Sequence, residues 1–373
     1  MMDAALREAD RPRALWWLRT GGRSQPLSTF EFWPAWLFYA PVAVQWLAFG
    51  LRFGSPLLLT AANPRIVAGG LCGESKSSIL DQVEAPARQW LAPYVRVTTE
   101  SDPQAGIAAA EAALARAGLA YPVVGKPDIG CNGTGVRLLQ KRDDLVRFIV
   151  DYPSGVGVIF QEFIPYEGEA GIFYIRHPDE LKGKVTSLTL KSAPVVVGDG
   201  RSTIEDLIRN DPRAGLVPHL YLPRLAGRLK EVPPTGTPVK LVFVGNHCKG
   251  STFRNGAQEI TATLAATIDS IAQAIPDFHF GRIDVRFASL AQLRRGRGFR
   301  IIEINGSGSE ATHVWDPNMK LADAYSAQFF HYRAAFMIGR ANRSRGHRPT
   351  SIRETFRLWR LQKRLMASYP MND

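Results

Sequence analysis

The sequence predicts a strand-rich α+β fold, and three observations support this prediction. Segments in which apolar and polar residues alternate, as they do in half-buried strands, follow one another along much of the chain. Segments with apolar residues at helical spacing lie between groups of strands, so a doubly wound parallel sheet is not expected for the whole chain. With 45% hydrophobic and 21% charged residues among 373, the composition is that of a globular protein with a sizeable core.

Positive charge predominates in this chain. Lys and Arg outnumber Asp and Glu by 46 to 34, which gives a formal net charge of +12 and suits anionic partners such as nucleotides or an acidic membrane surface. The excess gathers near the two ends, at Arg7, Arg11, Arg13, Arg19 and Arg23 and again between Arg340 and Arg364. A nucleic-acid groove through the centre of the fold is therefore not expected.

The cysteines predict neither a disulfide framework nor a zinc site. Cys72, Cys131 and Cys248 are odd in number and widely spaced, and no CxxC is present. No secretory signal is visible, because the first apolar run begins only near Phe30 and no small-residue cleavage site follows it. We expect reduced thiols in a cytoplasmic protein.

The N-terminal region differs in character from the rest. Residues 1–29 are polar and rich in Arg, whereas residues 32–51 carry no charge. Twenty residues is about the length of a membrane-spanning helix, but Pro34 and Pro41 interrupt the run and its aromatic residues are scattered along it. Three interpretations stay open: a helical segment packed on the domain, an interfacial membrane segment, or a true span.

Between residues 55 and 164 the patterns predict a sheet with a hairpin and three helices. Short apolar or alternating runs predict strands at 55–60, 94–98, 121–126, 136–140 and 156–164. Helical spacing predicts helices at 78–90, 105–118 and 143–150. Gly118 is expected to cap the second helix, and the acidic pair at 143–144 to begin the third.

The same patterns continue towards the C-terminus. Strands are predicted at 170–177, 184–192, 239–244, 280–287 and 299–304. Helices are predicted at 203–210, 257–275, 317–340 and 352–369. The segment 211–238 is rich in Pro and is expected to be irregular.

Polar residues interrupt the last two apolar strands. Side chains alternate along a strand, so Glu303 and Asn305 point the same way, and Asp284 on the companion strand can join them. Two carboxylates and an amide oxygen form a hard donor set that suits Mg²⁺ held together with phosphates. Because isoleucines surround these positions, we favour a metal site over a solvated sheet face.

A lysine and a glycine-rich turn follow the strand 121–126. Backbone N–H groups at Gly130, Gly133 and Gly135 can approach phosphates where no Cβ blocks them, and Lys126 adds a positive charge. There is no GK[ST] signature, so this is not a P-loop. Taken alone, the turn is equally typical of a structural hairpin.

The strand 156–164 ends in residues suited to a flat heterocycle. Gln161 and Glu162 are followed by Phe163 and Ile164, so backbone groups could pair with a base beside apolar walls. A carboxylate a few residues on could hold ribose hydroxyls. An ordinary edge strand and turn would give the same pattern.

The order and spacing of these segments resemble those of ATP-grasp enzymes. A Lys–Gly loop, QEFI with a following Glu, RID and EINGSG occur in that order, as in the D-alanine–D-alanine ligase and glutathione synthetase group. Residues 194–208 also resemble the ATP-grasp part of cyanophycin synthetase. The resemblance covers about residues 74–325 and implies an ATP-grasp fold, in which two α+β subdomains clasp ATP.

The resemblance also implies which residues contact the nucleotide. They are Lys76, Lys126, Gly130, Gly133 and Gly135 at the phosphates, Gln161, Glu162 and Ile164 at the adenine, Glu169 in preference to Glu167 at the ribose, and one of Lys182, Lys184 and Lys191 at a further phosphate oxygen. Gln161 departs from the acidic residue that is usual at its position.

A second set of residues is implied for the reaction. These are Asp284, Glu303 and Asn305 as ligands of Mg²⁺ or Mn²⁺, Arg282 at the transferring phosphoryl group and the tetrahedral intermediate, and Ser307 and Gly308 where the acyl acceptor meets the site. Apart from the resemblance, His247 and Arg254 in the segment 245–256 are predicted as substrate contacts. The implied activity is Mg-ATP-dependent activation of a carboxylate as an acyl phosphate, followed by its joining to an amine or a thiol.

Other activities share the same nucleotide site. An ATP-grasp kinase and a non-catalytic nucleotide-binding protein at a membrane stay open as alternatives. The expected partners are a small-molecule or lipid-linked carboxylate and an amine acceptor. Nucleic acid is not expected, and a homodimer is compatible with the sequence.

Both ends of the chain depart from the family pattern. Residues 1–75 form an apolar, aromatic segment where a full pre-ATP-grasp domain would stand, 76–340 form the ATP-grasp domain, and 341–373 carry a basic amphipathic helix. That helix either packs on its own domain or lies on an anionic membrane. Together with residues 32–51, it predicts peripheral attachment at the cytosolic face.

Overall fold

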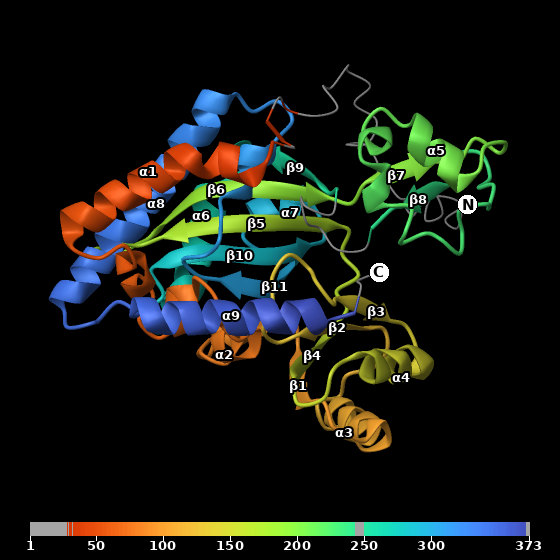
Figure 1. Cartoon of the computed structure of the whole chain (residues 1–373), viewed down its shortest axis with the longest axis horizontal. Helices are drawn as coiled ribbons and strands as arrows, with labels where there is room; N and C mark the ends of the chain where they lie inside the picture. The colour runs from red at the N-terminus through yellow and green to blue at the C-terminus, as the bar shows by residue number, and fades with distance from the viewer. Residues whose placement is uncertain (1–27, 29, 32, 243–249, 371–373) are drawn as a thin grey trace, which may run out of the picture.

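The computed structural model describes residues 28, 30, 31, 33–242 and 250–370. In this part of the chain the strands form sheets of four, five and two strands, all with antiparallel pairing, and helices pack on them (Figure 1). The fold is therefore α+β, as the sequence predicts.

The four-stranded sheet has the order β1-β4-β2-β3. Its strands are β1 (Tyr94–Thr98), β2 (Val123–Pro127), β3 (Arg137–Leu139) and β4 (Gly157–Glu162), and the helices α3 (Pro103–Arg116) and α4 (Arg142–Asp151) pack against it. Phe148 of α4 and Phe160 of β4 meet edge to face in the core. β2 and β4 are the two inner strands of this sheet. These strands, whose ends carry Lys126 and Gln161, are therefore paired with a neighbouring strand on each side.

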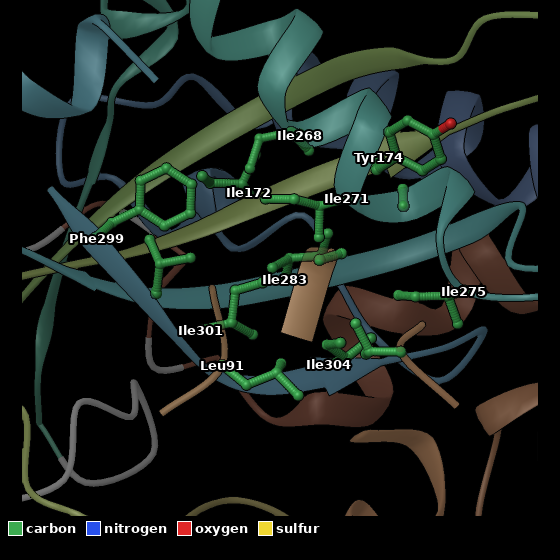
Figure 2. Close-up of a cluster of buried hydrophobic side chains, with 14 of the residues drawn as sticks. Leu91, Ile172, Tyr174, Ile268, Ile271, Ile275, Ile283, Phe299, Ile301 and Ile304 are labelled. Carbon is green, nitrogen blue, oxygen red and sulfur yellow. The ribbon is translucent and has the colours of Figure 1, made fainter. Parts of the chain in front are cut away.

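The five-stranded sheet has the order β11-β10-β5-β6-β9. Its strands are β5 (Gly168–Ile175), β6 (Lys184–Ser192), β9 (Thr252–Asn255), β10 (Phe280–Phe287) and β11 (Phe299–Asn305). Ile172 and Ile283 on one face pack with Ile268 of α6 (Ala262–Gln273), in the cluster drawn in Figure 2. Burying each such side chain stabilises the fold by roughly 1.5–3 kcal/mol.

The opposite face of this sheet is covered only in part. Phe173 and Phe280 pack against Phe336 of α8 (Leu321–Ser344), and α1 (Ala35–Phe53) lies along α8 on the outside (Figure 1). Further along the same strands the face carries polar residues and borders a cavity. Because side chains alternate along each strand, one face of the sheet lies wholly in the hydrophobic core. The other face lies partly in the core and partly along the cavity.

A small lobe extends from the end of β6. It contains β7 (Val195–Val197), β8 (Pro238–Lys240) and α5 (Ile204–Asn210), with Ile208 and Tyr221 in its core. The segment 211–238, expected to be irregular, contains short 3₁₀ turns.

Three predicted elements are wrong or shortened. The strand predicted at 55–60 is a turn and a buried 3₁₀ helix, Leu58–Ala61, because a short apolar run does not distinguish a strand from a buried helical turn. The helix predicted at 78–90 is divided into α2 (Lys76–Leu80) and a 3₁₀ turn at Ala87–Trp90, separated by Pro86. The strand predicted at 239–244 ends at Lys240, and its last two positions, 243 and 244, lie outside the described residues.

Other boundaries move by a few residues. The helix predicted at 257–275 begins with a 3₁₀ turn, Ala257–Glu259, before α6, and α8 runs four residues beyond the predicted end at 340. The short strands β7 and β9 were not predicted. α7 (Leu290–Arg294) follows β10.

α1 forms from the uncharged N-terminal run. It starts at Pro34, continues through Pro41 and ends at Gly54, which has a left-handed φ of 70°. One side packs on α8, which matches the first of the three interpretations, and the other side is exposed. No helix among the described residues has both the length and the apolar character needed to cross a membrane.

α9 (Ile352–Ser368) crosses the front of the molecule in Figure 1, between the two main sheets. Leu358 packs on Ala68 and Cys72, and Tyr369, just after the helix, enters the core of the four-stranded sheet. The outward side is basic and exposes Ile352, Phe356 and Trp359. The C-terminal helix therefore packs on the body of the protein.

Candidate functional site: a charged cavity between the two main sheets

A cavity of about 950 Å³ lies between the two main sheets. Its walls come from β2, β4, β5, β6, β10 and β11, from the glycine-rich hairpin after β2, and from the loop 70–76. One side chain of α9, Gln362, also reaches it. The cavity brings together predicted residues that lie more than 200 positions apart, including Lys76 and Asn305.

An ion cluster lies on the open face of β10 and β11. Arg282 donates to both oxygens of Asp284, from Nε at 2.8 Å and from Nη2 at 3.0 Å. Lys191 Nζ of β6 lies 3.0 Å from Asp284 Oδ1, and Asn305 Nδ2 donates to Asp284 Oδ2 at 3.2 Å. Burial alone would raise the pKa of Asp284, but Arg282 and Lys191 outweigh it, so this pKa lies below its usual value.

Glu303 stands directly across from Asp284 on β11. Its Oε1 lies 3.7 Å from Lys76 Nζ, and Lys76 also donates to the carbonyl of Gly130. Both carboxylates therefore face the cavity with a cation beside each. Lys76, predicted from its motif, is brought to the same site by α2.

The backbone before α2 is fixed by Asp128, a residue that the sequence patterns did not indicate. Its carboxylate accepts from Ser77 N at 2.9 Å, Ser75 Oγ at 2.8 Å and Arg96 Nε at 3.0 Å. The N–H of Lys76 donates to the Asp128 carbonyl at 2.9 Å. Asp128 thus joins the end of β2 to the turn that carries Lys76.

Lys126 is buried at the junction of the two sheets. Its ammonium donates to Gln161 Oε1 at 2.8 Å and to the carbonyl of Ile302 at 2.9 Å. Burial lowers the pKa of Lys126 to about 8, and Glu303 opposes this shift only in part. Gln161 also donates to the carbonyl of Ala92 at 3.2 Å, so this side chain positions the lysine.

The glycine-rich hairpin forms one edge of the cavity. Gly133 and Gly135 have φ of 66° and 73°, a region that favours glycine, and Gly130 and Gly133 line the cavity. Gly135 does not line it, and its carbonyl accepts from the hydroxyl of Tyr152 at 2.6 Å. Gly135 therefore shapes the hairpin rather than contacting the space inside.

The adenine hinge, by which we mean the segment 161–164 that is predicted to contact adenine, lies at the end of β4. Glu162 and Ile164 line the cavity beside Phe163. Arg286 of β10 donates to the Ile164 carbonyl at 3.0 Å and lies over the Phe163 ring at 5.4 Å. Arg286, which was not predicted, ties this hinge to the other sheet.

The structure distinguishes between the alternatives that the sequence left open for the ribose contact and for the further phosphate contact. Glu169 lines the cavity, 3.5 Å from Lys191 Nζ, whereas Glu167 is exposed outside it. Among the three lysines left open by the sequence, Lys191 is buried in the cavity, and Lys182 and Lys184 are exposed elsewhere.

Two predicted substrate contacts are not at the cavity. Ser307 is buried and donates to the Leu59 carbonyl at 2.9 Å, and Arg254 on β9 is exposed away from the cavity lining. Gly308 does line the cavity, and its N–H donates to the Gly70 carbonyl at 2.6 Å. His247 lies outside the described residues.

The donor chemistry of the site fits a hard divalent cation. Asp284, Glu303 and Asn305 offer only oxygen as ligands. Nearby, Glu74 Oε2 is buried without a hydrogen-bond partner among the described residues, and burial raises the pKa of Glu74. The described residues contain no cluster of three or more His, Cys, Asp or Glu side chains that could hold a metal, so phosphate oxygens would have to complete the coordination.

Comparisons with known proteins give matches only among solved structures. No protein-family model matches the sequence, and no curated protein does. Similar structures include a bifunctional glutathione synthetase from Pasteurella multocida (14% identity, TM-score 0.35, 68% of this chain and 36% of that one). They also include a D-alanine–D-alanine ligase from Bacillus anthracis (13%, 0.39, 75% and 70%) and a D-cycloserine synthetase (15%, 0.37, 75% and 71%).

This chain spans about a third of the length of the glutathione synthetase. At these identities the similarity concerns the fold alone. These are ATP-grasp proteins, and the structural resemblance is the one that the order of the sequence motifs predicts.

Proposed function

We propose that the chain is an ATP-dependent ligase that activates a carboxylate as an acyl phosphate and joins it to an amine. The observation that carries this proposal is the ion cluster in the cavity. Arg282 and Lys191 each place a charged nitrogen within 3.0 Å of Asp284, and Lys76 and Lys126 line the same cavity. Such a set suits binding a polyphosphate and stabilising charge during phosphoryl transfer.

The reaction would run in two balanced steps. A carboxylate oxygen of the substrate attacks the γ-phosphorus of ATP, and the bond to the bridging oxygen breaks to release ADP. The amine nitrogen then attacks the acyl carbon, phosphate leaves with the bonding electrons, and the nitrogen loses a proton. Lys76 and Lys126 would hold the phosphates, and Arg282 would face the charge that develops at the acyl carbon.

Asp284, Glu303 and Asn305, with Glu74 beside them, would hold Mg²⁺ or Mn²⁺. The metal would supply charge neutralisation for the phosphates when bound. Arg282 and Lys191 both contact Asp284, and these two cations would orient its carboxylate for this role. In this proposal residues 76–340 form the catalytic unit, and several described residues between positions 31 and 74 complete the lining of the cavity.

The test measures products with the full-length chain. Mg-ATP is supplied with pools of carboxylic acids, alone and with pools of amines or thiols, and ADP and free phosphate are measured separately. A ligase releases both in equal amounts and requires an acid and an acceptor. An acid supplied with hydroxylamine should give a hydroxamate, which traps the acyl phosphate.

The controls separate the competing activities. Asp284→Asn keeps the size of the side chain and should lower turnover by about 100-fold or more. Asp179→Asn makes the same change at an exposed position and should leave turnover unaltered. ADP formation without free phosphate would indicate a kinase instead, and nucleotide binding without turnover in any pool would contradict catalysis.

We also propose that one face of the molecule attaches to an anionic membrane. Leu47 and Leu51 are 61% and 86% exposed at the end of α1. Beside them, the guanidinium groups of Arg52 and Arg340 lie over the Phe53 ring, and both arginines are exposed. Apolar side chains ringed by arginine suit a surface of anionic lipid.

A further inference from the structure

The cavity has a second end whose lining differs from that of the phosphate end. Aromatic side chains of α1, β9 and the loop after β11 line it, namely Phe38, Tyr39, Phe253 and Trp315. Phe38 and Trp315 are buried and pack against each other at 4.6 Å between ring centroids. This end is therefore a preformed apolar surface, built in part by the segment 35–53.

Glu310 presents a carboxylate at this end of the cavity. Tyr39 Oη donates to its Oε1 at 2.8 Å, and Trp315 Nε1 donates to its Oε2 at 2.6 Å. The amide of Gln328 also donates to Oε1. All three donors are neutral, so they orient the carboxylate without cancelling its charge.

No cationic side chain among the described residues forms an ion pair with Glu310. The other carboxylate in this region, Glu31, is paired with Arg213. Arg282 interacts electrostatically with Glu310 without forming an ion pair, and the hydrogen-bond partners of this partly buried carboxylate are neutral. A further cation would stabilise it, since electrostatic attraction is stronger away from bulk water. A cationic group of a ligand would supply this charge.

Glu310 is also connected to the reacting centre. Arg282 Nη1 donates to the Glu310 carbonyl at 3.0 Å while its other nitrogens bind Asp284. A molecule held by the Glu310 side chain would therefore lie next to Arg282. This position is suited to the second substrate of the ligase.

We propose that the aromatic end of the cavity binds a cationic amine with a flat apolar body, and that Glu310 recognises its positive group. The rings would cover the apolar body and add cation–π attraction. As the assignment of this molecule to the amine acceptor, the proposal rests on the ligase function above. As a statement about binding, it does not require turnover.

The test compares three probes of the same shape on the unmodified full-length chain. 2-Phenylethylamine is cationic at neutral pH, 2-phenylethanol is neutral and 3-phenylpropionate is anionic. Calorimetric titration should show the amine binding about tenfold or more tightly than either of the others. Equal or tighter binding of the anion would overturn the proposal, whether or not any variant folds.

Three substitutions test whether Glu310 is the source of the preference for the amine. Glu310→Gln should abolish the preference for the amine, whereas Glu180→Gln, the same change at an exposed position, should preserve it. Tyr39→Phe removes one neutral donor and keeps the charge, so the preference should persist. An unchanged preference in a folded Glu310→Gln variant would also overturn the proposal.

The binding titration and the ligase assay can fail independently of each other. Selective amine binding without ATP turnover would support this pocket and contradict the ligase. Turnover with an acceptor that lacks a cationic group, together with no amine preference in titration, would support the ligase and contradict the pocket.

Discussion

The side chain of Lys126 combines burial with a role that needs positive charge. Only 7% of the residue is exposed, and its pKa is lowered to about 8 chiefly by desolvation. A phosphate ligand must keep its proton to attract the nucleotide. The affinity of the free chain for ATP should therefore depend on pH in a range where ATP itself no longer titrates.

We expect the dissociation constant of Mg-ATP to be nearly constant between about pH 7 and 8. Above pH 8 it should rise by roughly tenfold per unit, because the free chain loses the Lys126 proton that the complex retains. Fluorescence titration from about pH 7 to 9.5 checks this. Lys126→Met should bind weakly at every pH with a flat profile, and a steep profile in that variant would contradict the assignment.

His331 predicts a second pH effect, on stability. It is 6% exposed in α8, where Nδ1–H donates to the Ala327 carbonyl at 2.7 Å and Nε2 accepts from Thr186 Oγ1 at 3.0 Å. Burial lowers its pKa to about 4 from an ordinary value near 6.5. At this position the unfolded chain therefore binds a proton more readily than the folded chain. The stability that neutral His331 contributes is fully present above pH 6.5 and is lost as the pH falls towards 4.

The expected loss from His331 is about 2 kcal/mol of unfolding free energy between pH 7.5 and 5. Urea unfolding at the two pH values measures it. His331→Gln cannot titrate and should reduce the difference between the two pH values by about that amount, whatever it costs at pH 7.5. An equal pH dependence in the variant would show that other groups are responsible.

Site residues that belong to contiguous sequence motifs could be predicted from the sequence. Site residues that reach the cavity only through the packing of distant elements could not. Lys126, Asp284 and Glu303 stand out because a polar residue interrupts or ends an apolar strand. Gln362 and Glu310 carry no such signal, since the first is one polar position on a basic helix and the second follows a loop. Only the approach of α9 and α1 to the cavity makes them functional candidates.

At the scale of elements, α9 fastens the glycine-rich hairpin. Tyr369 Oη donates to the Ile129 carbonyl at 2.9 Å, and Gln362 Oε1 accepts from Gly73 N at 2.6 Å. One helix therefore holds both the hairpin and the loop before Lys76. The hairpin should be less mobile with these bonds than without them.

Tyr369→Phe should speed hydrogen exchange of the amides at 129–136 and raise the KM for ATP about two- to tenfold, because one hydrogen bond contributes roughly 0.5–1.5 kcal/mol. Exchange in β10 should be unaltered. Trp359→Ala, on the exposed side of the same helix, is the matched control. Equal exchange in both variants would mean that α9 does not restrain the hairpin.

Long alternating strands were predicted well, and short elements were not. β5, β6 and β10 carry eight or nine residues each, so their period is plain in the sequence. β9 has four residues and exists because it pairs with the edge of β6 through Lys191 and Phe253. Such pairing is decided by the neighbour, which local patterns do not contain.

At the scale of the whole molecule, three exposed arginines and the exposed end of α1 lie on one face. Arg343 Nη1 donates to the Phe53 carbonyl at 2.8 Å, which adds a third arginine to Arg52 and Arg340 around Phe53. Figure 1 shows α1 and α8 lying along each other on the outside of the five-stranded sheet. The substrate end of the cavity lies beyond the other end of α1, so attachment here would leave the cavity open.

The membrane proposal predicts binding that requires both charge and the apolar residues. The full-length chain should co-sediment with vesicles containing anionic phosphatidylserine and not with purely zwitterionic vesicles, and added salt should release it. Leu51→Glu should weaken binding by about tenfold or more, since an anion replaces an apolar group at the lipid surface. Val150→Glu makes a similar change at an exposed position on α4 and should bind like the original chain. Equal weakening by both variants would indicate a general effect of net charge, and binding to zwitterionic vesicles that resists salt would contradict an electrostatic contribution. If the prediction holds, the amine acceptor or the carboxylate can be sought among molecules at a membrane surface.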